Sequence, residues 1–247
     1  MCMKKVLGLA FMLLMTVNGF SQNGETTEHR FYDLYLLLNQ GKYEKCVKKA
    51  ERLVKKDKNQ REPLPYLYMS MAYSKMFESV DYRIENPKLL KNAAMVAARY
   101  RKKDKHNLFL EQNKDFFEDL RVKVKSEAKE EFLNKKFSKA SSWYKKVVKF
   151  FPEDYGAWTL LAVSQYYAKD KGSGDESMAS MEEALDRRYR MFDLPDADKD
   201  FKEGMELYSQ YLIEIGQSDS ARSASIWVQE ALAKSDERKR DFIQGRF

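Results

Sequence analysis

Apolar and small residues recur every three or four positions along much of the chain, separated by lysines and acidic residues. Between positions 137 and 149, one predicted helical face carries Ala140, Tyr144, Val147 and Val148. Pro152 prevents this helix from continuing, because proline lacks a backbone N–H and its ring clashes with the preceding turn. Asp154 can cap a following helix, in which Trp158 and Leu161 keep the helical spacing. The stretch therefore predicts two helices joined by a tight turn.

The spacing of these two helices is repeated in other parts of the chain. Three predicted second helices carry packing residues at intervals of four and then three: Cys46, Ala50 and Leu53; Ala140, Tyr144 and Val147; Ala221, Ser225 and Val228. Three predicted first helices share intervals of three, one and three: Tyr66, Met69, Ser70 and Tyr73; Trp158, Leu161, Ala162 and Gln165; Met205, Tyr208, Ser209 and Leu212. Gly41, Lys135 and Gly216 precede the three second helices at equal distances. This repetition predicts an array of similar helix pairs.

On these residues the chain resembles the tetratricopeptide repeat (TPR) family, whose unit of about 34 residues is a helix, a turn and a second helix. The best match spans 121–154 and includes Pro152. Further units are expected at 27–60, 64–103 and 155–189, before a last pair whose final helix covers about 218–240. The resemblance implies an all-α fold, a TPR-like α-solenoid of about four to six stacked antiparallel helix pairs.

Two connections in this array are expected to be lengthened, by "FESVDYRIENPK" in the second unit and by "KDKGSGDES" in the fourth. The latter segment is rich in glycine but lacks the lysine that follows the glycine in a phosphate-binding loop. It is therefore predicted to be a flexible turn. "LPDADKDF" leads into the last pair. Its Asp196, Asp198 and Asp200 alternate like calcium ligands, but Phe201 stands where the required glycine would be. An acid-rich helix start, favoured by the helix dipole, explains the same residues.

The beginning of the chain is typical of a signal peptide. Two lysines precede the apolar stretch 6–17, which is shorter than the ~18–20 apolar residues that a membrane-spanning helix needs. Gly19 and Ser21 provide the small residues of a cleavage site. We therefore expect residues 1–21 to be a cleaved signal peptide and 22–247 to form one helical repeat domain, with no transmembrane segment, in the periplasm or cell envelope. An uncleaved membrane anchor is the alternative.

Composition supports a folded helical protein. The chain is 43% hydrophobic and 34% charged, with only 10 Gly and 5 Pro, so turns that need special backbone angles are few. Loss of the signal peptide lowers the formal net charge from +7 to about +5. This modest surplus favours acidic partners or anionic surfaces over nucleic acid. Cys46 then has no second cysteine to pair with, and its place in the repeat predicts an inert core thiol.

The inner wall of such a solenoid, built from the first helix of each pair, is the expected binding surface. The family's geometry implies that the residues left for a partner include Phe31, Tyr35, Leu67, Met71, Lys125, Lys129, Phe132, Thr159, Val163 and Tyr166. Several of these are expected to fill the core instead. Because no asparagine accompanies Lys125 and Lys129, an extended peptide or helix is expected rather than a clamped carboxylate. The sequence thus predicts a non-catalytic scaffold for a protein or peptide partner of acidic character, without metal or cofactor.

Two alternative functions stay open. The densest basic run, "RYRKKDKH", contains Arg99, Arg101, Lys102, Lys103 and Lys105. It is either the solvated end of a helix or a patch that binds anionic lipid or lipopolysaccharide at the membrane periphery. The acidic cluster from Asp193 to Asp200 is dense enough in carboxylates for a hydrolase that acts on envelope polymers. His29 and His106 have no neighbours at metal-ligand spacing.

Overall fold

The computed structural model describes residues 30–56, 59–107, 110–187 and 195–245, and within these ranges the chain is helical, without a β-strand. The helices are α2 (Tyr32–Asn39), α3 (Tyr43–Val54), α4 (Leu64–Glu78), α5 (Val80–Glu85), α6 (Leu89–Lys103), α7 (Lys114–Leu133), α8 (Phe137–Phe150), α9 (Tyr155–Tyr167), α10 (Lys171–Asp186), α11 (Pro195–Glu214) and α12 (Ser218–Ile243), with the short 3₁₀ helix η2 at Glu111–Asn113. The predicted all-α fold is confirmed. The predicted signal peptide lies outside the described residues.

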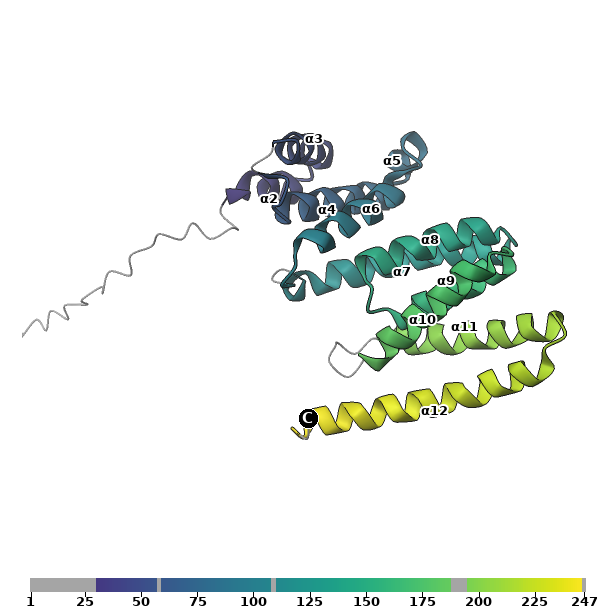
Figure 1. The fold of residues 1–247 in the computed structure, drawn as a ribbon. Helices are drawn as coiled ribbons and strands as arrows, with labels where there is room; N and C mark the ends of the chain where they lie inside the picture. Colours follow the sequence, from purple (N-terminus) through teal and green to yellow (C-terminus); the bar gives the residue numbers. More distant parts are fainter. Residues whose placement is uncertain (1–29, 57–58, 108–109, 188–194, 246–247) are drawn as a thin grey trace, which may run out of the picture.

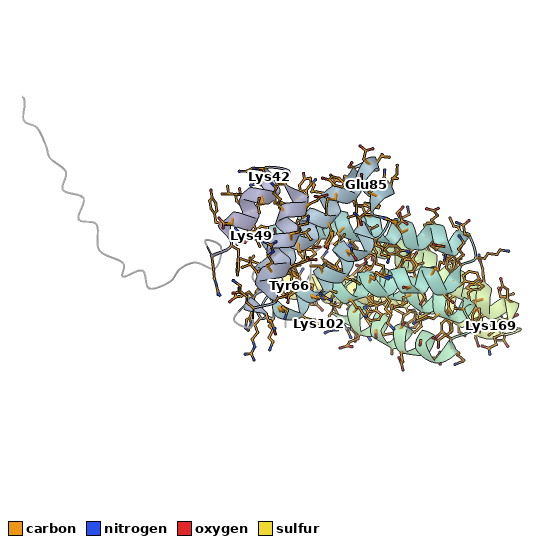
Figure 2. The ribbon with its side chains drawn as sticks, turned by 90° about the horizontal axis from the view of Figure 1, so that it is seen from above. Lys42, Lys49, Tyr66, Glu85, Lys102 and Lys169 are labelled. Carbon is orange, nitrogen blue, oxygen red and sulfur yellow. The ribbon has the colours of Figure 1, made fainter. Side chains whose placement is uncertain are left out.

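The helices pack in successive pairs that follow one another along the molecule. Within pairs, α2 contacts α3, α4 contacts α6, α7 contacts α8, α9 contacts α10 and α11 contacts α12. Between pairs, α3 contacts α4, α6 contacts α8, α8 contacts α9 and α9 contacts α11. The pairs run from α2 and α3 at one end to α11 and α12 at the other (Figure 1), and in the perpendicular view Lys49 and Lys169 lie toward opposite ends (Figure 2). The arrangement is compatible with an α-solenoid.

Four of the pairs share the same three-residue turn between their helices. The middle residue of each turn has a left-handed backbone: Gly41, Lys135, Lys169 and Gly216, with φ of 69°, 58°, 63° and 80°. In each turn the N–H of the last residue donates to a carbonyl five residues earlier, at 2.8 to 2.9 Å. This pattern ends a helix by satisfying carbonyls that have no partner within it. Gly41, Lys135 and Gly216, which the sequence spacing placed just before three second helices, lie in these turns, and Lys169 occupies the same position in a fourth.

The expected long turn at 169–177 is wrong, because these residues enter α10 after the short turn. Asp170 caps α10 by accepting a hydrogen bond from the Ser173 N–H at 3.2 Å. Gly174 is buried, and a Cβ there would lie 2.6 Å from the ring of Tyr166 on α9. This glycine therefore allows α10 to pack closely on α9, rather than making a turn flexible. By contrast, the lengthened connection expected in the second unit is present and contains α5.

Cys46 lies in the core of the first units, as predicted. Its side chain is fully buried, and its Sγ donates to the Leu34 carbonyl oxygen at 3.6 Å. Burial raises the pKa of this thiol to about 11, so it stays protonated at neutral pH and is a poor nucleophile. Within the described ranges no helix combines the length and apolar character needed to cross a membrane.

Candidate functional site

A groove of about 380 Å³ runs along the junction of α6 and α8. From α6 it is lined by Lys91, Ala94, Met95, Ala98, Arg99 and Lys102, and from α8 by Ser142, Lys145, Lys146 and Lys149. On each helix these residues recur at three- and four-residue steps, which place them on one face. Six of the ten lining residues are cationic and none is acidic.

The base of the groove is apolar and shallow. Ala94 and Ala98 are buried, one helical turn apart, and their short side chains leave room between the longer chains on either side. Met95 is 39% exposed and is the large apolar side chain of the lining. A ligand in this groove would meet methyl and thioether groups below and ammonium groups at the rims. Such a surface suits a ligand that carries both apolar groups and negative charge.

The positive charge of the groove is not balanced by carboxylates. None of its six cations makes an ion pair with a described residue. Lys146 donates to the Ser142 carbonyl oxygen and hydroxyl at 2.7 and 3.0 Å, and its Nζ lies 5.0 Å from the Trp143 ring centroid. Partial burial, followed by the charges of Lys91 and Lys149, lowers the pKa of Lys146. A bound anion would relieve this repulsion.

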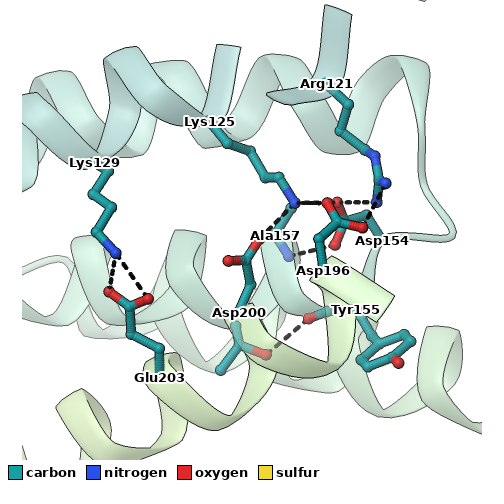
Figure 3. A network of polar contacts seen from close by, with 10 residues as sticks. Arg121, Lys125, Lys129, Asp154, Tyr155, Ala157, Asp196, Asp200 and Glu203 are labelled. Atoms are coloured by element: carbon teal, nitrogen blue, oxygen red, sulfur yellow. Dashed lines mark hydrogen bonds and ion pairs between the residues drawn. The ribbon is translucent and has the colours of Figure 1, made fainter. Parts of the chain in front are cut away.

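In contrast to the groove, a buried ionic network that joins α7, α9 and α11 pairs its cations with carboxylates (Figure 3). Arg121 donates to Asp154 at 2.9 Å and to Asp196 at 2.7 Å. Lys125 lies 3.3, 2.6 and 2.5 Å from carboxylate oxygens of Asp154, Asp196 and Asp200. Asp154 also accepts the Ala157 N–H at 2.8 Å, which confirms it as the cap of α9. The network fixes three helices relative to one another.

The carboxylates of this network have different proton affinities. Burial alone would raise the pKa of Asp196, but Lys125 and Arg121 outweigh it and the pKa is lowered. For Asp200, burial is the largest effect, and Asp154 and Asp196 reinforce it against Lys125, so the pKa is raised. Burial also disfavours the charge of Lys125, yet Asp154 and Asp200 hold its pKa above the ordinary value. Every charged group here already has a protein partner.

This geometry changes the interpretation of the acidic cluster. Asp193 lies outside the described residues, while Asp196 and Asp200 are tied to cations of α7. Asp198 accepts a hydrogen bond from the Tyr155 hydroxyl. Among the described residues, no group of three or more His, Cys, Asp or Glu side chains is placed to hold a metal ion. The described part of the cluster therefore connects helices.

The inner-wall residues predicted from the sequence do not form one exposed surface. Six of them are buried: Phe31, Leu67, Lys125, Thr159, Val163 and Tyr166. The reason is that helices such as α9 are covered by neighbours on several sides, here α8, α10 and α11. Of the others, Met71 and Phe132 are half-buried, Lys129 is exposed but pairs with Glu203 at 2.6 Å, and Tyr35 is 44% exposed. Several of the ten residues were expected to fill the core, and these six do so; as a binding surface for a partner, their assignment is corrected.

The predicted basic patch divides in the structure. Arg99 and Lys102 line the groove. Arg101 turns away and pairs with Glu153 at 2.6 Å, and the Nζ of Lys103 lies 5.1 Å from the centroid of the Tyr66 ring. Lys105 is exposed beyond the end of α6. Only two members of the run therefore contribute to the site.

Four cations of the groove were missed by the sequence analysis: Lys91, Lys145, Lys146 and Lys149. Their spacing places them on one face of each of two predicted second helices, but only the packing of α6 on α8 brings these two faces together.

Comparisons of the chain with protein-family models, with curated proteins and with solved structures give no match.

Proposed function

We propose that this protein is a non-catalytic, TPR-like scaffold that binds an acidic segment of a protein partner through the groove between α6 and α8. The observation that carries the proposal is the set of six cations around an apolar base, with no carboxylate in the lining. Elsewhere the buried cations Arg121 and Lys125 are neutralised by aspartates of the same chain. A polypeptide can supply what the groove lacks, carboxylates and apolar side chains at a regular spacing.

The repeated turns support the TPR-like part of this proposal. Four helix pairs use the same number of turn residues and the same left-handed position, as expected of a repeated unit. Export to the periplasm or cell envelope is proposed from the lysines, apolar stretch and small residues of 1–21. N-terminal sequencing of the mature protein tests this part, and a chain that retains Lys4 and Lys5 would contradict it.

The binding proposal is tested with a defined probe, a fluorescent helical peptide that carries glutamates on one face and alanines at its centre. We expect fluorescence anisotropy to show binding at low salt that weakens at high salt, where the Debye length falls to about 3 Å. Lys91→Glu combined with Lys145→Glu reverses one exposed charge on each rim. This variant is expected to bind at least about tenfold more weakly.

The matched control is Lys45→Glu with Lys48→Glu, which makes the same change in net charge at exposed positions of α3. If both double variants lose affinity equally, the peptide responds to net charge and the groove is not its site. Vesicles of phosphatidylglycerol and phosphatidylcholine form the second arm. Groove-dependent binding to these vesicles without binding to the peptide would replace the protein partner by an anionic membrane.

A further inference from the structure

Helix α10 presents a row of acidic side chains to solvent. Its exposed acids are Asp175, Glu176, Glu182, Glu183 and Asp186, with the small exposed residue Ala179 near the middle of the row. The opposite face of α10 is buried through Gly174, Ser177, Met181, Ala184 and Leu185. We refer to the exposed face, residues 175–186, as the acidic ridge.

The acidic ridge borders two hollows that lie between α10 and α12. Asp175, Ala179, Glu182 and Asp186 line these hollows on the α10 side, and Trp227 of α12 lines both. The largest contacts of α10 are with α9, whereas α9 also packs on α8 and α11. Glu176 and Glu183 are exposed and line neither hollow, so this flank of the ridge stays accessible to a large partner. An exposed helix face of this kind can lie in a groove between two other helices.

The acidic ridge and the basic groove match in charge and in length. The groove offers six cations without a carboxylate, and the ridge offers five carboxylates around a small residue. Lys91 to Lys102 in the groove and Asp175 to Asp186 on the ridge each span twelve residues, with about 16 Å of helix between the end residues. Ala179 on the ridge is small enough to approach the alanines at the base of the groove.

The charges of the ridge are available for a new partner. Asp175 and Glu183 form exposed pairs with Lys171 and Arg187, and Asp186 pairs with the partly exposed Arg238; surface pairs of this kind are weak. Asp175 also accepts a hydrogen bond from the Tyr166 hydroxyl at 2.8 Å. Glu176 and Glu182 make no ion pair with a described residue. Docking would exchange weak pairs for several charge contacts around apolar groups that become protected from water.

We propose that the groove of one copy receives the acidic ridge of a second copy of this chain. The ridge cannot reach the groove of its own chain, because α9 holds α10 on a different helix pair. Since groove and ridge are different surfaces, the contact either repeats from copy to copy or occurs twice in a reciprocal dimer. The inference rests on the proposed function of the groove as a receptor for acidic protein segments, and it names one such segment.

The test uses two charge-reversed proteins and sedimentation velocity at low salt. The groove variant is Lys91→Glu with Lys145→Glu, and the ridge variant is Glu176→Lys with Glu182→Lys. All four side chains are exposed, so both variants are expected to retain the wild-type helical circular dichroism spectrum. The wild type is expected to associate with rising concentration, while each variant alone stays monomeric.

Mixing the two variants gives the decisive result. The groove variant keeps an intact ridge and the ridge variant keeps an intact groove, so together they are expected to form a one-to-one complex. Glu44→Lys with Glu206→Lys is the matched control for the ridge, because both residues are exposed on other helices, and it is expected to associate like the wild type. Loss of the complex at high salt would agree with docking through charge.

Two outcomes overturn the inference: a wild type that stays monomeric at every concentration, or a mixture of variants that forms no complex. The peptide assay separates this failure from a failure of the proposed function. If the wild type is monomeric but binds the glutamate-rich peptide through the groove, self-docking is wrong and the scaffold function stands. If peptide binding is also insensitive to reversal of the groove, both proposals are wrong.

Discussion

Lys125 in the buried network and Lys146 in the groove show how two lysines of one helical array can have opposite roles. Lys125 contacts three aspartates, and their charges hold its pKa above the ordinary value despite burial. Lys146 is partly buried among other lysines, and its pKa is lowered. The first lysine is satisfied within the chain and stabilises the fold. The second leaves a charge that a partner can neutralise.

The comparison shows that the density of charge in the sequence does not locate a binding surface. Both regions are rich in charged residues, but only the network contains the opposite charges at bonding distance. A buried cation without its carboxylate would cost several kcal/mol, so the network must be complete for the fold to form. Exposed cations tolerate the lack of a partner because water solvates them. A site for a charged partner is therefore best sought where the chain leaves its own charges unpaired.

The largest effect is expected when the network is broken at Asp154. Asp154→Ala removes the cap of α9 and leaves Arg121 and Lys125 with fewer opposite charges in a buried place. We expect the free energy of unfolding to fall by about 3–5 kcal/mol, measured by urea denaturation. Asp170→Ala is the control, because Asp170 caps α10 at an exposed position and forms no ion pair with a described residue, and this substitution should cost only about 1 kcal/mol. Equal losses in the two variants would show that the network adds nothing beyond a cap.

The network also shows what the sequence could predict and what it could not. The cap at Asp154 followed from local pattern, since it lies between a proline and a helical run. Its pairing with Arg121, thirty-three residues earlier, and that of Asp196 with Lys125, seventy-one residues apart, depend on how whole helices pack. For the same reason Lys125 was placed on a binding surface, although α9 and α11 enclose it. Periodicity identifies the buried face of one helix but does not say how many neighbours cover the other faces.

The turns and the groove likewise divide into features that local sequence spacing predicts and features that depend on how the helices pack. The sequence spacing placed Gly41, Lys135 and Gly216 just before three second helices, because each lies at the same distance from the first packing residue of its helix. Lys169 was missed because the glycines that follow it indicated a loop, whereas Gly174 is required by its contact with Tyr166. The two rims of the groove come from different helix pairs. Their lysines form a site only through the packing of α6 on α8.

A smaller, pH-dependent effect is expected from the two aspartates of α11. The pKa of Asp196 is lowered in the folded protein, so its stabilisation is present above its unfolded pKa of about 3.9 and is lost as the pH falls through the folded value. Asp196→Asn should therefore lower the free energy of unfolding by about 1 kcal/mol at neutral pH, because the side chain is partly exposed. Urea denaturation should show this loss fading below about pH 4.

Asp200→Asn is the matched comparison on the same helix. The pKa of Asp200 is raised, so its favourable contribution is present below its unfolded pKa and is lost as the pH rises through the folded value. At neutral pH the substitution removes a charge that burial and two neighbouring aspartates disfavour, and the stability should change by less than about 1 kcal/mol. A loss that is as large as that of Asp196→Asn, with the same pH profile, would contradict the different environments of the two carboxylates.

The smallest effect is expected in the groove and has the opposite sign. Lys149 lies one turn from Lys145 and close enough to Lys146 to lower its pKa. Lys149→Gln removes this repulsion, so the free energy of unfolding should rise by about 0.3 kcal/mol and the pKa of Lys146, followed by NMR of the lysine side chains, should increase. The same change at Lys123, which pairs with Glu78 and Asp119 at 2.8 and 2.6 Å, should lower the stability instead. If Lys149→Gln also destabilised the protein and left the pKa of Lys146 unchanged, the groove lysines would have partners within the chain, and the groove would have no unpaired charge to offer.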